Sequence, residues 1–161
     1  MILLFPGSFD QPHLGHLDVL RRAAAVARTA GGELLVAIAD HPEKCAFLTL
    51  DQRIALLSEL CAGDHTTRIV TYRGATVHFA RANGVTALVR GLRNPLDFEN
   101  EKSMAEVNRS HGFDTLFLMT AGVHAHLSSH LVRSARAADL PLDDLVPPTV
   151  AQALARTPLK P

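Results

Sequence analysis

The sequence predicts one α/β domain over residues 1–161, with five parallel strands in a doubly wound, Rossmann-like sheet and helices on both faces. Apolar runs of strand length alternate with segments of helical periodicity along the chain. The run Glu33–Ala39 is apolar almost throughout, as is typical of a strand covered on both faces. The length of 161 residues suits one domain with a sizeable core, and no linker, repeat or low-complexity segment divides the chain.

Each element has its own local signal. Thr49 and Gln52 form a capping-box pattern, and Asn94 followed by Pro95 is a typical helix start. The predicted strands lie at residues 2–5, 33–39, 67–72, 86–89 and 115–119. The first predicted helix follows the turn after residue 5 and ends at the glycine pair 31–32, and the others lie at about 50–62, 76–82, 95–111, 130–138 and 149–156, before a tail at 157–161.

The stretch PGSFDQPHLGH, residues 6–16, has the composition of an anion-binding turn between a strand and a helix. Gly7 permits a tight turn whose free N–H groups can face an anion. Gly15 lies in the first helical turn, where a glycine costs about 1 kcal/mol relative to alanine, so we expect a close approach to the backbone there. His13 and His16 lie on one face of that turn.

Charge and cysteine usage restrict the partners and the compartment. The 16 basic and 16 acidic residues balance, and the pI of about 7.1 gives no overall field that would favour nucleic acid or a membrane surface. Cys45 and Cys61 form no metal-binding or disulfide pattern, and no apolar run approaches the length of a membrane span. We therefore expect reduced thiols and a cytoplasmic protein without a targeting segment.

Candidate phosphate-binding side chains follow the predicted strands. In a doubly wound sheet, ligands bind beyond the carboxyl ends of the strands, at a topological switch point. Phosphate groups could be bound by the features found here, which are a glycine turn, separate cations and a helix that starts at serine. The P-loop, GxGxxG, GxSxG and HExxH patterns are absent, which disfavours the enzyme classes that they mark. Each residue also has an ordinary structural interpretation, as a solvated cation or a helix cap. The side chains concerned are His16, Lys44, Arg90, Arg93 and Ser128.

Several motifs together resemble one family. PGSFDQPHLGH is similar to the (T/H)xGH signature of the nucleotidyltransferase superfamily. Nearly end to end, the chain also resembles bacterial phosphopantetheine adenylyltransferases. The motifs that carry this resemblance are RGLR at 90–93, DFE at 97–99, Thr49-Leu50 with Arg53, and VPP at 146–148. The resemblance implies an enzyme of coenzyme A biosynthesis that transfers the adenylyl group of ATP to 4′-phosphopantetheine, giving dephospho-coenzyme A and pyrophosphate with Mg²⁺.

The resemblance also implies roles for individual residues. His16 would stabilise the α-phosphate in the transition state together with the catalytic residues Ser8, Lys44 and Arg93. The implied ATP-binding residues are Ser8, Phe9, His16, Gly91, Leu92, Arg93, Glu101, His124, Ser128, Ser129 and His130. The implied phosphopantetheine-binding residues are Ser8, Lys44, Thr76, Arg90, Met104 and Asn108. No protein metal ligand is expected, because phosphates and waters would hold Mg²⁺. The family is commonly a homohexamer.

The chain departs from the family pattern at several places, which include the residues near His13 and Cys45. Gln11 replaces a proline, and His124, His126 and His130 replace polar and aromatic positions. We interpret the three histidines as lining the ATP pocket, with a metal cluster as the alternative. Two other functions stay open: a related nucleotidyltransferase with another phosphorylated acceptor, and a nucleotide-binding homologue without turnover.

Overall fold

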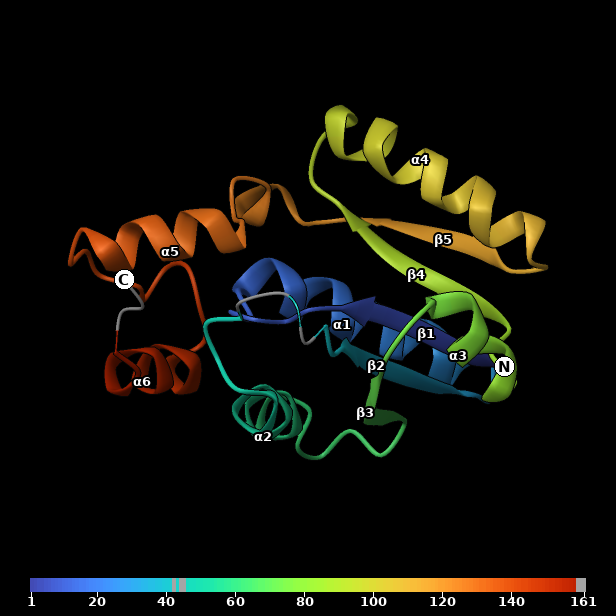
Figure 1. The fold of residues 1–161 in the computed structure, drawn as a ribbon, viewed down its shortest axis with the longest axis horizontal. Coiled ribbons are helices and arrows are strands. Elements are labelled where there is room, and N and C mark those ends of the chain that lie inside the picture. The colour runs from blue at the N-terminus through green and yellow to red at the C-terminus, as the bar shows by residue number, and fades with distance from the viewer. Residues whose placement is uncertain (42, 44–45, 159–161) are drawn as a thin grey trace.

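The computed structural model describes residues 1–41, 43 and 46–158, and it confirms the predicted fold class (Figure 1). The five strands are β1 (Ile2–Gly7), β2 (Glu33–Ala39), β3 (Thr67–Tyr72), β4 (Ala87–Leu92) and β5 (Asp114–Met119). They pair in parallel in the order β3-β2-β1-β4-β5. The chain first builds outward from β1 to β3 and then returns to add β4 and β5, so the topological switch point lies between β1 and β4.

Helices cover both faces of this sheet (Figure 1). On one face, α1 (Leu14–Thr29) and α2 (Leu50–Leu60) bury a core with alternate side chains of β1, β2 and β4. On the other face, α3 (Thr76–Ala82) packs on a second core, and α4 (Pro95–Ser110) contacts β4 and β5. This alternation of buried side chains is the period-two pattern of strands covered on both faces.

Helices α5 (Ser129–Ala137) and α6 (Pro148–Arg156) form a third apolar cluster with part of α2, beyond the carboxyl ends of the strands. The short 3-10 helix η1 (Gly122–His124) lies between β5 and α5 in the chain and buries none of its residues. Val132 of α5, Val150 and Leu154 of α6, and Leu56 of α2 are buried against one another there. The cluster places the start of α5 next to the switch point, as Figure 1 shows.

The helix caps agree with the sequence prediction, whereas the carboxyl ends of two strands do not. Thr49 and Gln52 form the expected capping box, and the Asn94 side chain caps α4, whose first residue is Pro95. Strand β1, however, continues to Gly7 instead of ending at residue 5, so Gly7 is its last residue. Strand β4 continues to Leu92 instead of ending at residue 89. The prediction that Arg90 follows a strand end is therefore wrong: its backbone lies within β4, because β5 pairs with it as far as Leu92 and Met119.

Strands β1 and β4 pair over a short distance and then separate. Their register contains Leu3 with Ala87 and Leu4 with Leu88, although both strands continue further. Their arrowheads diverge in Figure 1. The split leaves room between the carboxyl halves of the two strands, at the switch point.

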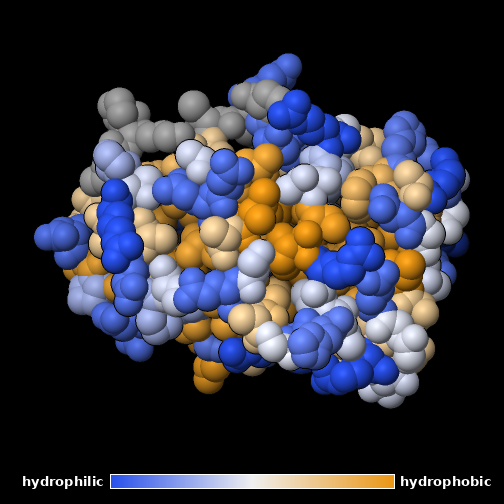
Figure 2. Space-filling view, turned by 90° about the horizontal axis from the view of Figure 1, so that it is seen from below, coloured by the Kyte–Doolittle hydropathy of each residue, from blue (hydrophilic) through white to orange (hydrophobic). Residues whose placement is uncertain are grey.

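The face of the molecule seen from below is apolar in its centre and hydrophilic around its rim (Figure 2). Partly buried side chains such as Leu60, Ile54 and Ile69 complete the packing of α2 and β3 on the core.

None of the described helices combines the length and the apolar character that crossing a bilayer requires.

Helix α1 and strand β4 approach each other closely at Gly91. A Cβ atom at this position would lie 2.9 Å from Cγ2 of Val19, a buried residue of α1. We predict that Gly91→Ala lowers the free energy of unfolding by about 1–3 kcal/mol, because the new methyl group overpacks this contact. Urea unfolding measures the change. In a Val19→Ala background the same substitution should cost less, and an equal cost in both backgrounds would contradict the contact.

Candidate active site

A cavity of about 400 Å³ opens at the split, between the β1–α1 turn, β4, the start of α4 and the start of α5. Most of the residues predicted to bind ATP line it: Ser8, Phe9, His16, Gly91, Arg93, Glu101, Ser128 and Ser129. Four residues that are also expected there do not line this cavity: Leu92, His124, His126 and His130. Leu92 is buried in the core, and His130 is exposed at the start of α5. Their roles stay predictions that this geometry does not support.

A second cavity, of about 410 Å³, lies on the other side of the split. It contains the residues predicted to bind phosphopantetheine that the structure describes: Ser8, Thr76, Arg90, Met104 and Asn108. Lys44 lies outside the described residues. The two cavities share Pro6, Gly7, Ser8 and Arg90, so they meet at the end of β1.

The β1–α1 turn has a strained backbone. Phe9 has a φ of 46°, which is unusual for a bulky residue, and its buried ring packs edge-on against Phe5 and His16. A Cβ at Gly7 would lie 3.0 Å from the Phe9 ring, so the glycine accommodates that ring. The turn thereby buries Phe9 and leaves Ser8 exposed in both cavities.

His13 and His16 form a reciprocal cap at the start of α1. The His13 side chain accepts a hydrogen bond at Nδ1 from the His16 backbone N–H, and His16 Nδ1 accepts one from the His13 backbone N–H, both at 3.3 Å. The two rings are stacked, with centroids 3.7 Å apart. Gly15 permits this, because a Cβ there would lie 3.1 Å from His13 Nδ1. The close approach expected at Gly15 is thus made by a histidine ring.

Both imidazoles are neutral at pH 7. Burial lowers the pKa of His13 to about 4, and the charges of Arg93 and His124 act in the same direction. Burial also lowers the pKa of His16 well below its ordinary value, followed in size by the effects of His13, Arg93 and Arg90. Since Nδ1 of His16 accepts a hydrogen bond, its neutral ring carries the proton on Nε2, which is a donor.

The two arginines already form ion pairs with carboxylates of α4. Arg90 donates to both carboxylate oxygens of Glu101, through Nε at 2.7 Å and Nη2 at 2.5 Å, and its Nη1 donates to the Pro6 carbonyl at 3.0 Å. Arg93 makes the same bidentate contact with Asp97, through Nε and Nη2, and each hydrogen bond is 2.8 Å long. The bidentate face of each arginine, which was expected to bind phosphate, therefore binds a carboxylate. Each guanidinium still has two N–H donors that a ligand could use.

The start of α5 contacts the same cavity through Ser128 and through a hydrogen bond from Arg93. Ser128 caps the helix, since its Oγ accepts from the Leu131 N–H at 3.0 Å, and its hydroxyl proton remains available to the cavity that it lines. Arg93 Nη1 donates to the carbonyl of Leu127 at 3.0 Å. Ser128 thus acts as an ordinary helix cap and also lies in the cavity wall, as predicted.

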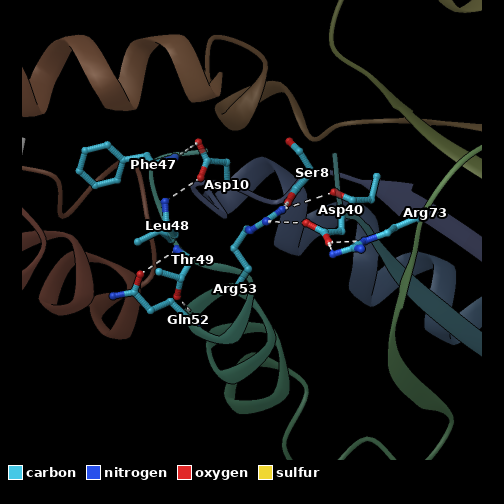
Figure 3. A network of polar contacts seen from close by, with 10 residues as sticks. Ser8, Asp10, Asp40, Phe47, Leu48, Thr49, Gln52, Arg53 and Arg73 are labelled. Carbon is cyan, nitrogen blue, oxygen red and sulfur yellow. Dashed lines mark hydrogen bonds and ion pairs between the residues drawn. The ribbon is translucent and has the colours of Figure 1, made fainter. Parts of the chain in front are cut away.

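Arg53 supports Ser8 from below (Figure 3). Its side chain is 5% exposed, and its Nη1 donates to the Ser8 carbonyl at 3.0 Å and to the Ala39 carbonyl at 3.5 Å. Its Nη2 lies 3.9 Å from Oδ1 of Asp40, which also pairs with the exposed Arg73. A buried cation thus links the first turn to the end of β2.

Asp10 fixes the segment that follows residue 45 to the same turn. Its carboxylate accepts the backbone N–H groups of Phe47 at 2.9 Å and Leu48 at 2.8 Å (Figure 3). Asp10 and Arg53 therefore connect the β1–α1 turn to the end of β2 and to the start of α2.

Sequence reasoning missed several residues of the site. His13 had no assigned role, and Arg53 served only to mark the resemblance, because its burial is visible only in the structure. Tyr72, whose hydroxyl is 2.9 Å from Thr76 Oγ1, lines the second cavity, and Asn100 and Thr120 line the first. No periodicity distinguishes these last three positions.

The acidic side chains of the site give a metal ion no ready protein ligands. Within residues 1–41, 43 and 46–158, no group of three or more His, Cys, Asp or Glu side chains is placed to hold a metal. Asp97 and Glu101, which line the first cavity, are engaged by the two arginines.

Comparison with known proteins gives the class first. Residues 4–135 match the model of the cytidylyltransferase-like family, so the chain belongs to the nucleotidyltransferase class. A structure assigned as a nicotinate-nucleotide adenylyltransferase from Vibrio parahaemolyticus superposes with a TM-score of 0.67 at 16% identity, over 96% of this chain and 91% of the other. At that identity the likeness concerns the fold alone.

Curated relatives then define the family within that class. The chain is 37% identical over 155 residues to the phosphopantetheine adenylyltransferase of Geotalea daltonii, covering 95% of this chain and 94% of the relative. It is 40% identical over 158 residues to that of Prochlorococcus marinus, covering 97% and 98%, and 38% identical over 151 residues to that of Corynebacterium diphtheriae, covering 92% of each. The chain belongs to the phosphopantetheine adenylyltransferase family.

Arg53 offers a test of how the turn is held. We predict that Arg53→Lys lowers the free energy of unfolding by about 2–4 kcal/mol and reduces kcat, because a single ammonium nitrogen lacks the planar fork with which Arg53 reaches the two carbonyls through Nη1 and Asp40 through Nη2. Arg73→Lys is the matched control, since Arg73 is exposed and pairs with the same carboxylate, and should change stability by less than about 1 kcal/mol. Denaturant unfolding and steady-state kinetics measure both, and equal effects of the two variants would contradict the role of Arg53.

Proposed function

We propose that this chain transfers the adenylyl group of ATP to 4′-phosphopantetheine, giving dephospho-coenzyme A and pyrophosphate in coenzyme A biosynthesis. The single observation that supports this most directly is the pair of cavities that meet at Ser8 and Arg90. An adenylyl transfer needs a nucleotide and an acceptor phosphate side by side, and each cavity contains most of the residues expected for one substrate.

His16 acts on the α-phosphate. Its Nε2–H donates a hydrogen bond to the phosphate oxygen as negative charge develops in the transition state. The neutral ring keeps its Nδ1 bond to the start of α1, so the donor is preorganised. The attacking group is a phosphate oxygen that is already charged, so the reaction requires no general base.

The cations act on the phosphates of both substrates. Arg90 lies where the cavities meet, and its remaining N–H donors reduce the repulsion between the acceptor phosphate and the nucleotide. Arg93 and the N–H groups at the start of α5 serve the β- and γ-phosphates. Lys44, as the resemblance implies, adds a further charge, and the Ser8 hydroxyl orients the acceptor phosphate.

Mg²⁺ fits this site as part of the ATP complex. The carboxylates of the first cavity are paired with arginines, so the phosphates and waters would hold the ion while Arg93, Ser128 and Ser129 hold the phosphates. When bound, the ion supplies neutralisation of the polyphosphate charge.

We predict that His16→Ala reduces kcat by about 10²–10³-fold, with the Kd for ATP changed by only a few-fold, because the lost bond strengthens in the transition state. Pyrophosphate and dephospho-coenzyme A released from Mg-ATP and 4′-phosphopantetheine measure turnover, and calorimetry measures ATP binding. His65→Ala, an exposed histidine before β3, is the matched control.

Two outcomes would contradict the function. Full turnover of His16→Ala would remove this residue from the mechanism. Folded wild-type protein that binds ATP but forms neither product would leave a different phosphorylated acceptor, or binding without turnover, as the function.

We also propose that the chain works as a homo-oligomer, with a hexamer as the state that the resemblance implies, and in the cytoplasm, where the free thiol of Cys61 stays reduced. Helix α4 buries Asn108 and exposes apolar side chains, and β5 exposes two more. These side chains are Leu96, Phe98, Met104, Val107, Leu116 and Met119. An exposed apolar face of this kind is typical of an interface.

We predict that light scattering after size exclusion gives a mass several times that of the 17.4 kDa chain. The double substitution Leu96→Glu and Val107→Glu should dissociate the assembly, since it places charge in an apolar interface. Leu140→Glu, at an exposed leucine after α5, is the matched control. A wild-type monomer would contradict the proposal.

A further inference from the structure

His13 lines the phosphate cavity, yet the proposed reaction assigns it no task. It is the N-cap of α1, it is buried, and it lies one helical turn from His16. Two different parts of the residue contact His16: the backbone N–H and the ring.

The backbone N–H determines which nitrogen of His16 carries the proton. It donates to His16 Nδ1, so the neutral ring must be protonated at Nε2. A proton added at Nδ1 would place two donors face to face and break this bond. The orientation of His16 therefore depends on its staying neutral.

The ring of His13 determines where the His16 ring lies. Its face is stacked on His16 with centroids 3.7 Å apart, and Phe9 packs edge-on against His16 at 5.5 Å. The His16 ring is thus covered by two aromatic rings of the β1–α1 turn. The ring of His13 also keeps water from His16, and this burial disfavours the imidazolium form.

Charged groups from other elements add to this effect. Arg90 and Arg93, from β4 and the turn after it, disfavour a positive charge on His16, and Arg93 and His124 of η1 disfavour one on His13. Asp97 and Glu101 of α4 line the same cavity and oppose this effect, but each is paired with one of the arginines.

We propose that His13 is a positioning residue for the adenylyl transfer: its backbone N–H and stacked ring hold the neutral His16 ring in the orientation that offers Nε2–H to the phosphate cavity. The kinetic part of this inference rests on the proposed function. The orientation and protonation of His16 do not.

Two substitutions separate the ring from the cap. His13→Asn keeps a good N-cap acceptor and the backbone N–H but removes the stacked ring. His13→Phe keeps a ring against His16 but removes the acceptor of the cap. A purely structural role as a helix cap predicts that the asparagine variant behaves like the wild type and the phenylalanine variant does not.

The first measurement is a pH titration of the imidazole nitrogens by ¹⁵N NMR without ligand, with the His16 signals assigned from their loss in His16→Ala. In the wild type we expect a neutral ring, protonated at Nε2, that stays neutral at a pH where an ordinary imidazole is already protonated. In His13→Asn the pKa of His16 should rise by about one unit, because water reaches the ring. In His13→Phe it should stay low.

The second measurement is the pH profile of kcat and the KM for ATP. We expect His13→Asn to lose about tenfold in kcat at pH 7 with KM changed less than about threefold, and its acid limb to move to higher pH. His13→Phe should recover the wild-type profile while melting at a lower temperature. A wild-type kcat and profile in His13→Asn would overturn the proposal. If neither the wild type nor the variants were active, the titration alone would test the proposal. An unchanged pKa and tautomer of His16 in His13→Asn would then overturn the proposal.

Discussion

The hydrogen bond from Arg90 to the Pro6 carbonyl crosses the split between β1 and β4, and the rest of the site depends on it. These strands pair at Leu3 and Leu4 and then diverge, so the sheet is open where its topology reverses. Arg90 bridges this opening and is itself held by Glu101 of α4. The two cavities lie on either side of the bridge and share it as a wall. The proposed reaction between two phosphates would thus have a fixed cation at its centre.

Around this bridge, the β1–α1 turn is held from several directions. Arg53 binds the Ser8 carbonyl, Asp10 binds the start of the α2 segment, and the ring of Phe9 fills the space that Gly7 leaves. The strained φ of Phe9 persists because these contacts determine the turn. Preorganisation of this kind is what a reaction without a protein nucleophile requires.

The sequence predicted the sheet because its signals are local: the apolar run of β2, the capping box at Thr49 and the Asn94-Pro95 start of α4 each specify an element without tertiary help. It placed the end of β4 too early, because Arg90 and Gly91 are poor strand formers that pairing with β5 keeps in the strand. The cavity residues came mainly from the resemblance. The pairing of Arg90 with Glu101, and the contact of Arg53 with Ser8, join elements distant in sequence, so no local pattern could have revealed them.

We expect the new bond to form where the two cavities meet. The most direct test is a crystal structure of the wild-type protein with dephospho-coenzyme A, the product that occupies both sides. The account predicts the adenylate in the cavity of His16 and Ser128, the pantetheine arm in the cavity of Thr76 and Asn108, and the joining pyrophosphate within hydrogen-bond distance of Arg90 or Ser8. A pyrophosphate bound away from both residues, or a ligand confined to one cavity, would contradict it.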